Sequence, residues 1–176
     1  MANQLVIISG PPRAGKSATA EALCQRYDRM LHIEMAALRE LLRMGLLRPS
    51  DASPEAESQR RLFIAAACDM ARRFLDAGYG VVIDDLITEE QLPYYKEQLA
   101  GLEAIAHFVV LLPQLDAVRE RAPGDQRAAR EDVRLETLYG EFGMWRGVSV
   151  LDPGDLAPEL VADRVMALAA QGEALL

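Results

Sequence analysis

The sequence has little asparagine and cysteine and no long apolar run, and each shortage excludes a class of protein. Asn3 is the single asparagine in 176 residues, so the chain lacks the base-reading Asn-Lys-x-Asp motif of regulatory GTPases. The two cysteines, Cys24 and Cys68, have no metal-ligand spacing and cannot form a disulfide framework, so we interpret both as small core residues. No stretch approaches about 18 consecutive apolar residues. No basic segment precedes a cleavable apolar one. We therefore expect a cytoplasmic protein without a membrane partner.

Acidic residues outnumber basic ones, 27 to 19, and this limits the partners that the protein can bind. The formal net charge is -8. Nucleic-acid binding depends on a basic face that neutralises phosphates, so we expect no nucleic-acid partner. A local basic pocket for one small phosphate compound is compatible with this charge. The length predicts a single domain over residues 1–176. A chain of this length is too short for a mechanical ATPase of the AAA type.

Apolar runs and amphipathic stretches alternate along the chain. The predicted strands cover residues 5–9, 30–33, 80–85, 105–112 and 148–151. The predicted helices cover residues 16–27, 35–44, 54–77, 88–99 and 158–170. Ser53, Pro54 and Glu55 are typical of a helix start, and Gly78 is typical of a helix end. Such alternation predicts an α/β fold in which helices cover both faces of a parallel sheet.

The stretch GPPRAGKS, residues 10–17, stands between the first predicted strand and the first predicted helix. This is the G-x-x-x-x-G-K-S phosphate-binding loop in the strand–loop–helix context that it requires. Its glycines permit the backbone turns, and its N–H groups with the helix N-terminus attract phosphate. Lys16 would bridge the terminal phosphates, and the Ser17 hydroxyl would hold Mg²⁺. The predicted nucleotide-binding residues are Gly10, Pro11, Pro12, Arg13, Ala14, Gly15, Lys16, Ser17 and Ala18.

Three acidic residues follow predicted strands. Asp84 and Asp85 end the third strand, where ligands gather in a doubly wound sheet, and a carboxylate there suits Mg²⁺ binding. Because side chains alternate along a strand, we expect different roles for the two; the alternative is that they only cap the turn. Glu34 follows the second strand and could accept the proton of an attacking hydroxyl group. The alternative is a solvated acid near a helix N-terminus.

Five arginines gather in the acidic chain between residues 119 and 134, around a predicted turn at Pro123 and Gly124. Guanidinium groups bind phosphoryl oxygens bidentately. We predict that residues 114–135 form a lid, and that Arg121 or Arg127, which flank the turn, holds phosphate. The alternative is a surface helix with ion pairs to neighbouring glutamates.

Four stretches together resemble the chloramphenicol phosphotransferase-like group of P-loop kinases, relatives of the shikimate and gluconate kinases. They are GPPRAGKS, HIEMAALRELL, VVIDDLI and VSVLDPGDLAPELVADRV. The resemblance implies a P-loop NTPase fold with α/β/α layers, a five-stranded parallel sheet of order 2-3-1-4-5 and a helical lid. It also implies ATP and Mg²⁺, and an acceptor held between the region after the second strand and the lid. Glu34 stands where the group usually has an aspartate base. The lid reads PGDQR at residues 123–127, where the group tends to read arginine-glycine-aspartate-arginine.

Three functions follow from these features. The first is an ATP-dependent phosphotransferase that acts on a hydroxyl group of a small metabolite or antibiotic. The second is a nucleotide or nucleoside kinase, for which we expect an arginine pair and a stacking aromatic residue in the acceptor region. Arg39, Arg43 and Phe63 lie in that region and neither exclude nor establish this function. The third is a nucleotide-binding regulatory protein without catalysis.

Other chemically versatile side chains are interpreted as structural. His32 and His107 are expected to be hydrogen-bonded strand residues. The leucines of residues 38–47 are expected in the core. An aromatic and leucine series is also expected in the core, or else in an acceptor pocket or the contact of a homodimer. Its members are Leu138, Tyr139, Phe142 and Trp145.

Overall fold

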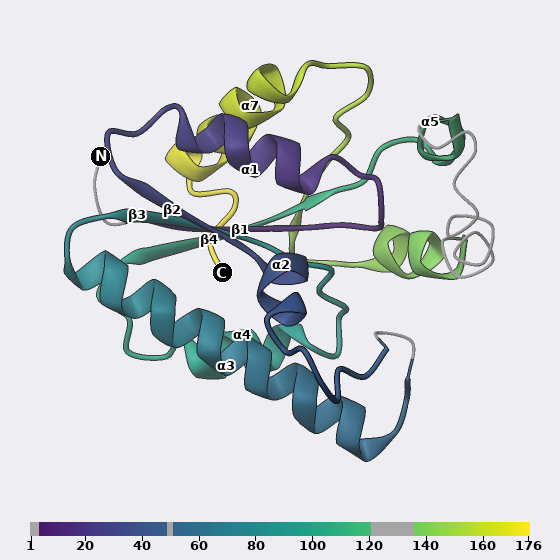
Figure 1. Ribbon diagram of the computed structural model, residues 1–176. Helices are drawn as coiled ribbons and strands as arrows, with labels where there is room; N and C mark the ends of the chain where they lie inside the picture. Colours follow the sequence, from purple (N-terminus) through teal and green to yellow (C-terminus); the bar gives the residue numbers. More distant parts are fainter. Residues whose placement is uncertain (1–3, 49–50, 121–135) are drawn as a thin grey trace.

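The computed structural model describes residues 4–48, 51–120 and 136–176 (Figure 1). Its centre is a five-stranded parallel sheet of order β2-β3-β1-β4-β5, which confirms the predicted fold class and strand order. The strands are β1 (Gln4–Ser9), β2 (Met30–Glu34), β3 (Gly80–Asp84), β4 (Ile105–Leu111) and β5 (Ser149–Leu151). Because all five are parallel, their carboxyl ends meet at one edge of the sheet, where the phosphate-loop sequence follows β1.

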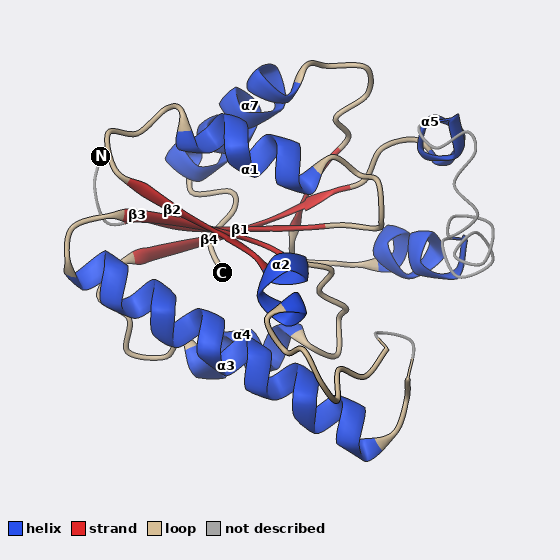
Figure 2. Cartoon of the chain, in the orientation of Figure 1, coloured by secondary structure: helices blue, strands red, loops and turns tan. Residues whose placement is uncertain are grey.

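Helices cover both faces of this sheet, as Figure 2 shows. Helices α1 and α7 lie on one face, and α3 and α4 lie on the other (Figure 1). The helices are α1 (Lys16–Cys24), α2 (Met35–Glu40), α3 (Pro54–Asp76), α4 (Leu92–Gln98), α5 (Leu115–Glu120) and α7 (Pro158–Gln171). Residues 136–144 form a further helix. In the described ranges, no helix is both long and apolar enough to cross a bilayer.

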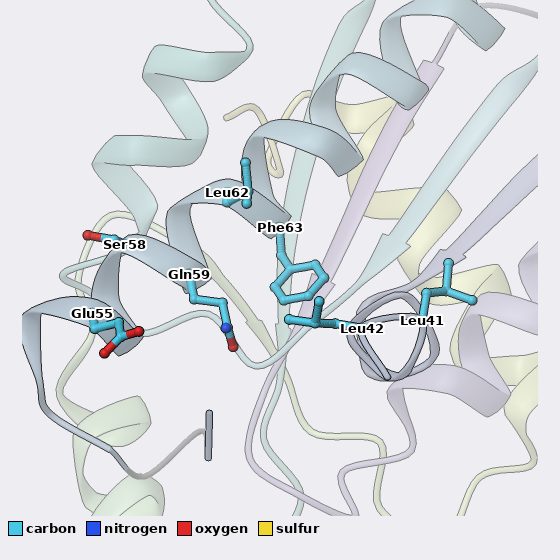
Figure 3. A pocket seen from close by; sticks show the side chains of 7 residues that line it. All are labelled: Leu41, Leu42, Glu55, Ser58, Gln59, Leu62 and Phe63. Carbon is cyan, nitrogen blue, oxygen red and sulfur yellow. The ribbon is translucent and has the colours of Figure 1, made fainter. Parts of the chain in front are cut away.

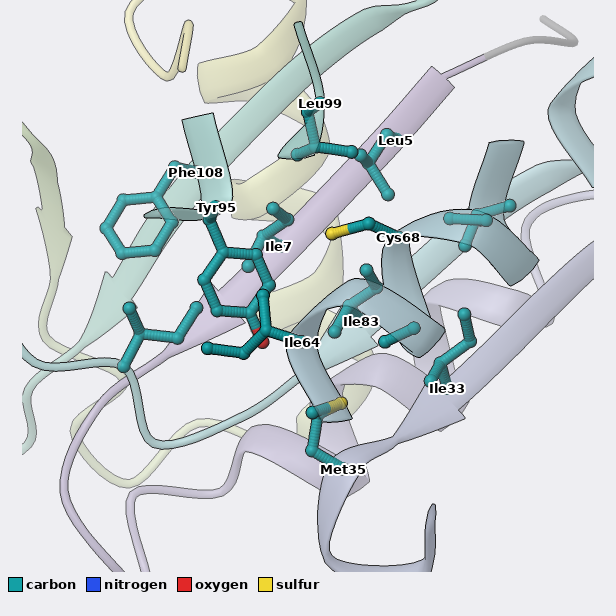
Figure 4. Close-up of a cluster of buried hydrophobic side chains, with 14 of the residues drawn as sticks. Leu5, Ile7, Ile33, Met35, Ile64, Cys68, Ile83, Tyr95, Leu99 and Phe108 are labelled. Carbon is teal, nitrogen blue, oxygen red and sulfur yellow. The ribbon is translucent and has the colours of Figure 1, made fainter. Parts of the chain in front are cut away.

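The central strands are apolar on both faces, which explains their continuous apolar sequences. On β1, Leu5 and Ile7 pack in the cluster beneath α3 and α4, drawn in Figure 4, while Val6 and Ile8 pack beneath α1 and α7. Two members of the aromatic series, Phe142 and Trp145, lie in the first cluster, where Trp145 stacks on Phe108. Leu138 is also buried, whereas Tyr139 is only partly buried, so the predicted place in the core is confirmed for three of the four residues. The sheet is therefore a rigid support for the loops at its carboxyl edge.

Helix α3 begins and ends as its sequence predicts. The Ser53 side chain accepts a hydrogen bond from the Ala56 N–H, and Pro54 occupies the first turn. At the other end Gly78 has φ +85°, the left-handed conformation that glycine adopts without strain. Both signals involve only residues next to the ends of the helix, so they can be recognised from the sequence.

Two expectations about core residues are wrong. Helix α2 ends at Glu40 rather than at residue 44, and Leu41, Leu42 and Leu46 are exposed instead of buried. A short helix needs a buried face to persist in water, and these leucines do not provide one. His107 lies in a strand but is not hydrogen-bonded as predicted: its buried ring nitrogens have no partner among the described residues, and burial lowers its pKa.

The chain returns to β4 after α7, which the sequence did not reveal. The Phe108 N–H donates to the Ala174 carbonyl oxygen at 2.7 Å, and the Leu176 N–H donates to the Ala106 carbonyl oxygen at 3.0 Å. This antiparallel segment covers the first half of β4, at the edge of the sheet opposite to the phosphate loop.

Candidate functional site

The loop between β1 and α1 has the backbone of a phosphate cradle. Arg13 and Gly15 both have positive φ, 65° and 90°, and Gly15 is the N-cap residue of α1. The N–H groups of Lys16, Ser17 and Ala18 lie in the first turn of α1, where helix geometry supplies no carbonyl partner. Such donors at the positive end of a helix bind anions.

The two motif glycines are required for different reasons. A Cβ atom on Gly10 would lie 2.2 Å from the Leu111 carbonyl oxygen, so the end of β4 excludes any side chain there. A Cβ atom on Gly15 would meet nothing within 4 Å, and there the positive φ is what favours glycine. Gly10 therefore allows the loop to pack against the end of β4. Gly15 allows the backbone conformation at the start of α1 and leaves the space beside the loop free.

Lys16 folds back over the loop. Its Nζ donates hydrogen bonds to the carbonyl oxygens of Gly10 and Pro11, both at 3.0 Å. Burial lowers the pKa of Lys16 to about 8, against the opposing effect of the nearby Asp84 and Asp85 carboxylates. The ammonium group is thus held at the phosphate loop but is only weakly stabilised in its charged form.

This pKa predicts how nucleotide affinity depends on pH. Below about 8 Lys16 is charged and attracts phosphate, and above that pH it becomes neutral. We expect the affinity for magnesium-bound ATP to fall by up to about tenfold per pH unit between about pH 8 and 9.5. Calorimetric titrations at several pH values measure it, and Lys16→Met removes the dependence. An affinity that stays constant or rises over this interval contradicts the role of Lys16.

Asp84 links the loop to the sheet. Its Oδ1 atom accepts a hydrogen bond from the Ser17 hydroxyl at 3.3 Å, and its Oδ2 atom accepts one from His32 Nε2 at 2.6 Å. The Asp84 side chain is almost fully buried. This brings together Ser17 and Asp84, two of the three residues that the sequence assigned to Mg²⁺. Hydroxyl and carboxylate oxygens are the ligands that Mg²⁺ prefers, so the donor set fits the ion.

The contact between His32 and Asp84 was not predicted, although His32 is hydrogen-bonded as expected. Register places Glu34 beside Asp84 and His32 beside Val82 on neighbouring strands. Side chains two residues apart share a face, so His32 and Asp84 point to the same side of the sheet. The contact could have been predicted from the sequence, because side chains alternate along both strands and β2 was expected beside β3. His32 orients Asp84 toward Ser17.

Asp85 points away from Ser17 and lies in a different network. Arg39 Nη2 donates to its Oδ1 and Oδ2 atoms at 2.9 and 3.2 Å, and the Tyr95 hydroxyl donates to Oδ2 at 2.9 Å. Burial, followed by the Asp85 charge, raises the pKa of Tyr95 well above its usual value, so the phenol stays a neutral donor. The Leu86 N–H also donates to Oδ1, at 2.8 Å. Three donors thus already satisfy this carboxylate, an arrangement that does not favour the metal role predicted for it. The two neighbouring acids do have different surroundings, as alternation requires.

Glu34 is exposed at the carboxyl edge, at the junction of β2 and α2. It is the N-cap residue of α2, but its side chain makes no capping hydrogen bond. Its carboxylate is therefore not used to start the helix, and its backbone is paired in register with Asp84.

The arginine-rich segment is only partly described. Arg119 of α5 pairs with Asp116 at 3.3 Å and also with Glu136, so one of the five arginines has the surface role of the alternative interpretation. Arg121 and Arg127 lie outside the described residues, as does most of the predicted lid.

Comparison with known proteins agrees with this architecture. A family model described as an AAA domain matches residues 5–139. The short length of the chain therefore excludes at most a mechanical role and not this family. Among curated proteins none matches the chain.

Solved structures share the fold over nearly the whole chain. The tunicamycin resistance protein of Deinococcus radiodurans is 22% identical, with 98% of each chain covered and a TM-score of 0.64. A gluconokinase from Sinorhizobium meliloti is 20% identical, with 97% and 94% covered and a TM-score of 0.65. The APS kinase of Mycobacterium tuberculosis, in complex with AMPPNP and APS, is 17% identical, with 96% and 98% covered and a TM-score of 0.69. At these identities the likeness establishes the fold.

Proposed function

Since the chain belongs to the AAA domain family and has the fold of the P-loop kinases, we propose that it transfers the γ-phosphate of ATP to a hydroxyl group of a small molecule. The observation that supports this proposal is one juxtaposition at the carboxyl edge of the sheet. There the phosphate loop with Lys16, the Ser17–Asp84 pair and the exposed Glu34 lie together. Phosphoryl transfer requires mainly positioning and charge stabilisation, which such a set provides.

Each group has a distinct task in this proposal. The amides of residues 15–18 and the Lys16 ammonium group hold the phosphates of ATP. Ser17 and Asp84 hold Mg²⁺, which would neutralise negative charge on the phosphoryl oxygens. His32 fixes the orientation of Asp84 through its 2.6 Å hydrogen bond. Arg121 and Arg127 remain the proposed clamps for the transferred group.

Glu34 is the proposed acceptor of the hydroxyl proton. It is exposed, it follows β2, and its backbone pairs with that of Asp84 on the adjacent strand. A carboxylate there can orient a hydroxyl group and take its proton during attack on the γ-phosphate. Aspartate and glutamate differ by one methylene group, so an acceptor bound here would stand slightly farther from the backbone than beside an aspartate.

The test of this function is release of ADP that depends on an acceptor. We expect release only with Mg²⁺ and only in the presence of a suitable hydroxyl compound in a panel of antibiotics, sugars, shikimate-like acids and nucleosides. Glu34→Gln should lower kcat about 100-fold, because the group that takes the proton is lost. A coupled assay of ADP formation measures both effects.

A matched control separates catalysis from a general effect of charge. Glu103→Gln removes an exposed acid just before β4, at the opposite edge of the sheet, and should leave kcat unchanged. Nucleosides or nucleotides as the preferred acceptors would favour the nucleoside kinase instead. Tight ATP binding without release for any acceptor would favour the regulatory protein.

A further inference from the structure

A group of apolar side chains is exposed beside the proposed reaction site. Leu41 is 68% exposed and Leu62 is 69% exposed, and Leu42, Met44 and Leu46 are exposed as well. They lie on the segment after α2 and on the first half of α3. Large apolar side chains gathered at one place mark a binding surface more often than scattered ones do.

Some of these side chains line a cavity of about 530 Å³. Its walls are drawn in Figure 3, where Leu42 and the Phe63 ring are directed toward one another. The lining residues are Leu41, Leu42, Glu55, Ser58, Gln59, Leu62 and Phe63. Small-molecule sites usually have volumes of about 300–1,000 Å³ and mostly apolar walls, so the cavity suits a compound of that size.

Hydrogen bonds hold the walls in place. The Leu47 N–H donates to Gln59 Oε1, and Gln59 Nε2 donates to the Gly45 carbonyl oxygen, both at 2.9 Å. The segment after α2 is thereby fixed to α3. Because Gln59 and Ser58 already have partners within the chain, the walls offer mainly apolar contact.

Helix α2 connects the proposed reaction site to the residues that line the cavity. This helix starts directly after Glu34, and Arg39 on it is bonded to Asp85 at the carboxyl edge of the sheet. Leu41 and Leu42 follow within one turn. A molecule whose hydroxyl group is beside Glu34 can therefore extend its body toward these leucines.

The charges around the cavity argue against an anionic occupant. Glu55 is the one charged residue in the lining. The nearby Arg60 and Arg61 of α3 are both paired with Glu57, at 3.0 and 2.9 Å. Arg39 is likewise engaged, by Asp85. Arg43 and Arg48 are exposed nearby but are not part of the lining. Within the lining, a carboxylate or phosphate group of an acceptor would therefore face the Glu55 carboxylate and no cation.

We propose that this cavity binds the apolar part of the phosphoryl acceptor, and that the acceptor is an uncharged molecule with a hydroxyl group on an aromatic or branched aliphatic body. This inference rests on the proposed function and narrows its substrate class. It separates the acceptor from nucleotides and from sugar acids, whose recognition requires cations.

The first test measures binding without catalysis. The neutral fluorescent probe N-phenyl-1-naphthylamine should bind saturably to the protein. Leu62→Ser should weaken its affinity about tenfold, because a leucine side chain is lost from an apolar wall. Leu160→Ser is the matched control, since Leu160 is 52% exposed on α7, across the sheet from the cavity, and its loss should change nothing.

The second test uses matched acceptors in the ADP-release assay and in competition with the probe. Phenyl β-D-glucoside should displace the probe, and methyl β-D-glucoside, shikimate and thymidine monophosphate should not. For whichever acceptor supports release, Leu62→Ser should raise KM about tenfold and leave kcat nearly unchanged. Ultracentrifugation of both variants reports whether a second copy of the chain covers the surface.

The outcomes distinguish this inference from the proposed function. Probe affinity equal in wild type and Leu62→Ser overturns the cavity assignment. So does a dimer that dissociates in Leu62→Ser, or a preferred acceptor that is anionic with a KM unaffected by the change. Absence of ADP release with every acceptor contradicts phosphoryl transfer, while the probe and competition results still decide what the cavity binds.

Discussion

Replacing Lys16 with alanine should lower kcat for phosphoryl transfer by at least about 100-fold. Loss of one preorganised charge donor has effects of this size. Lys16 is held at the loop by the carbonyl oxygens of Gly10 and Pro11, and a triphosphate competes for the same ammonium group. Because transfer concentrates charge on the phosphoryl oxygens, the lost ammonium group matters more in the transition state than in the bound substrate.

The chain provides a close control for this substitution. Lys96, on the exposed face of α4, is the one other lysine in the sequence. Lys96→Ala should leave kcat unchanged, and both variants should fold, because alanine is favourable in helices. Equal turnover by Lys16→Ala and wild type would remove the central residue of the proposed mechanism.

Replacing Asp85 with alanine should lower the free energy of unfolding by about 3–5 kcal/mol, the cost of breaking a buried ion pair by removing one partner. The Asp85 carboxylate is buried and accepts hydrogen bonds from both Arg39 and Tyr95. Its removal leaves the guanidinium group and the buried phenol without their acceptor. Chemical denaturation followed by circular dichroism measures the change.

Two further variants test the origin of this effect. Tyr95→Phe removes one donor and leaves Arg39 in place, so it should cost only about 1–2 kcal/mol. Asp69→Ala removes an exposed acid of α3 and should change stability by less than about 0.5 kcal/mol. An Asp85→Ala protein as stable as Asp69→Ala would mean that the network does not support the fold.

The sequence alone predicted the fold and the phosphate loop because both depend on local patterns. The apolar run of β1 and the spacing of Gly10, Gly15 and Lys16 are contiguous, so no distant residue was required to recognise them. The strand order came from the resemblance to known kinases. The alternation of side chains also separated Asp84 from Asp85 correctly, because it follows from strand geometry.

The remaining features depend on contacts between distant parts of the chain. Asp85 meets Tyr95 and Arg39 only because α2 and α4 pack on the same side of the sheet. The leucines after α2 have an amphipathic spacing that predicts burial, but no element among the described residues covers Leu41. Spacing along a helix reports which residues share a face and not whether a partner exists for that face.

Calorimetric titration of the wild-type protein with magnesium-bound ATP at about pH 7.5 measures directly whether the turn between β1 and α1 binds a triphosphate. We predict saturable binding of one ATP per chain, weaker binding in Lys16→Ala, and unchanged binding in Lys96→Ala. Absence of heat and of thermal protection in the wild-type protein, with ATP and equally with GTP, would contradict it.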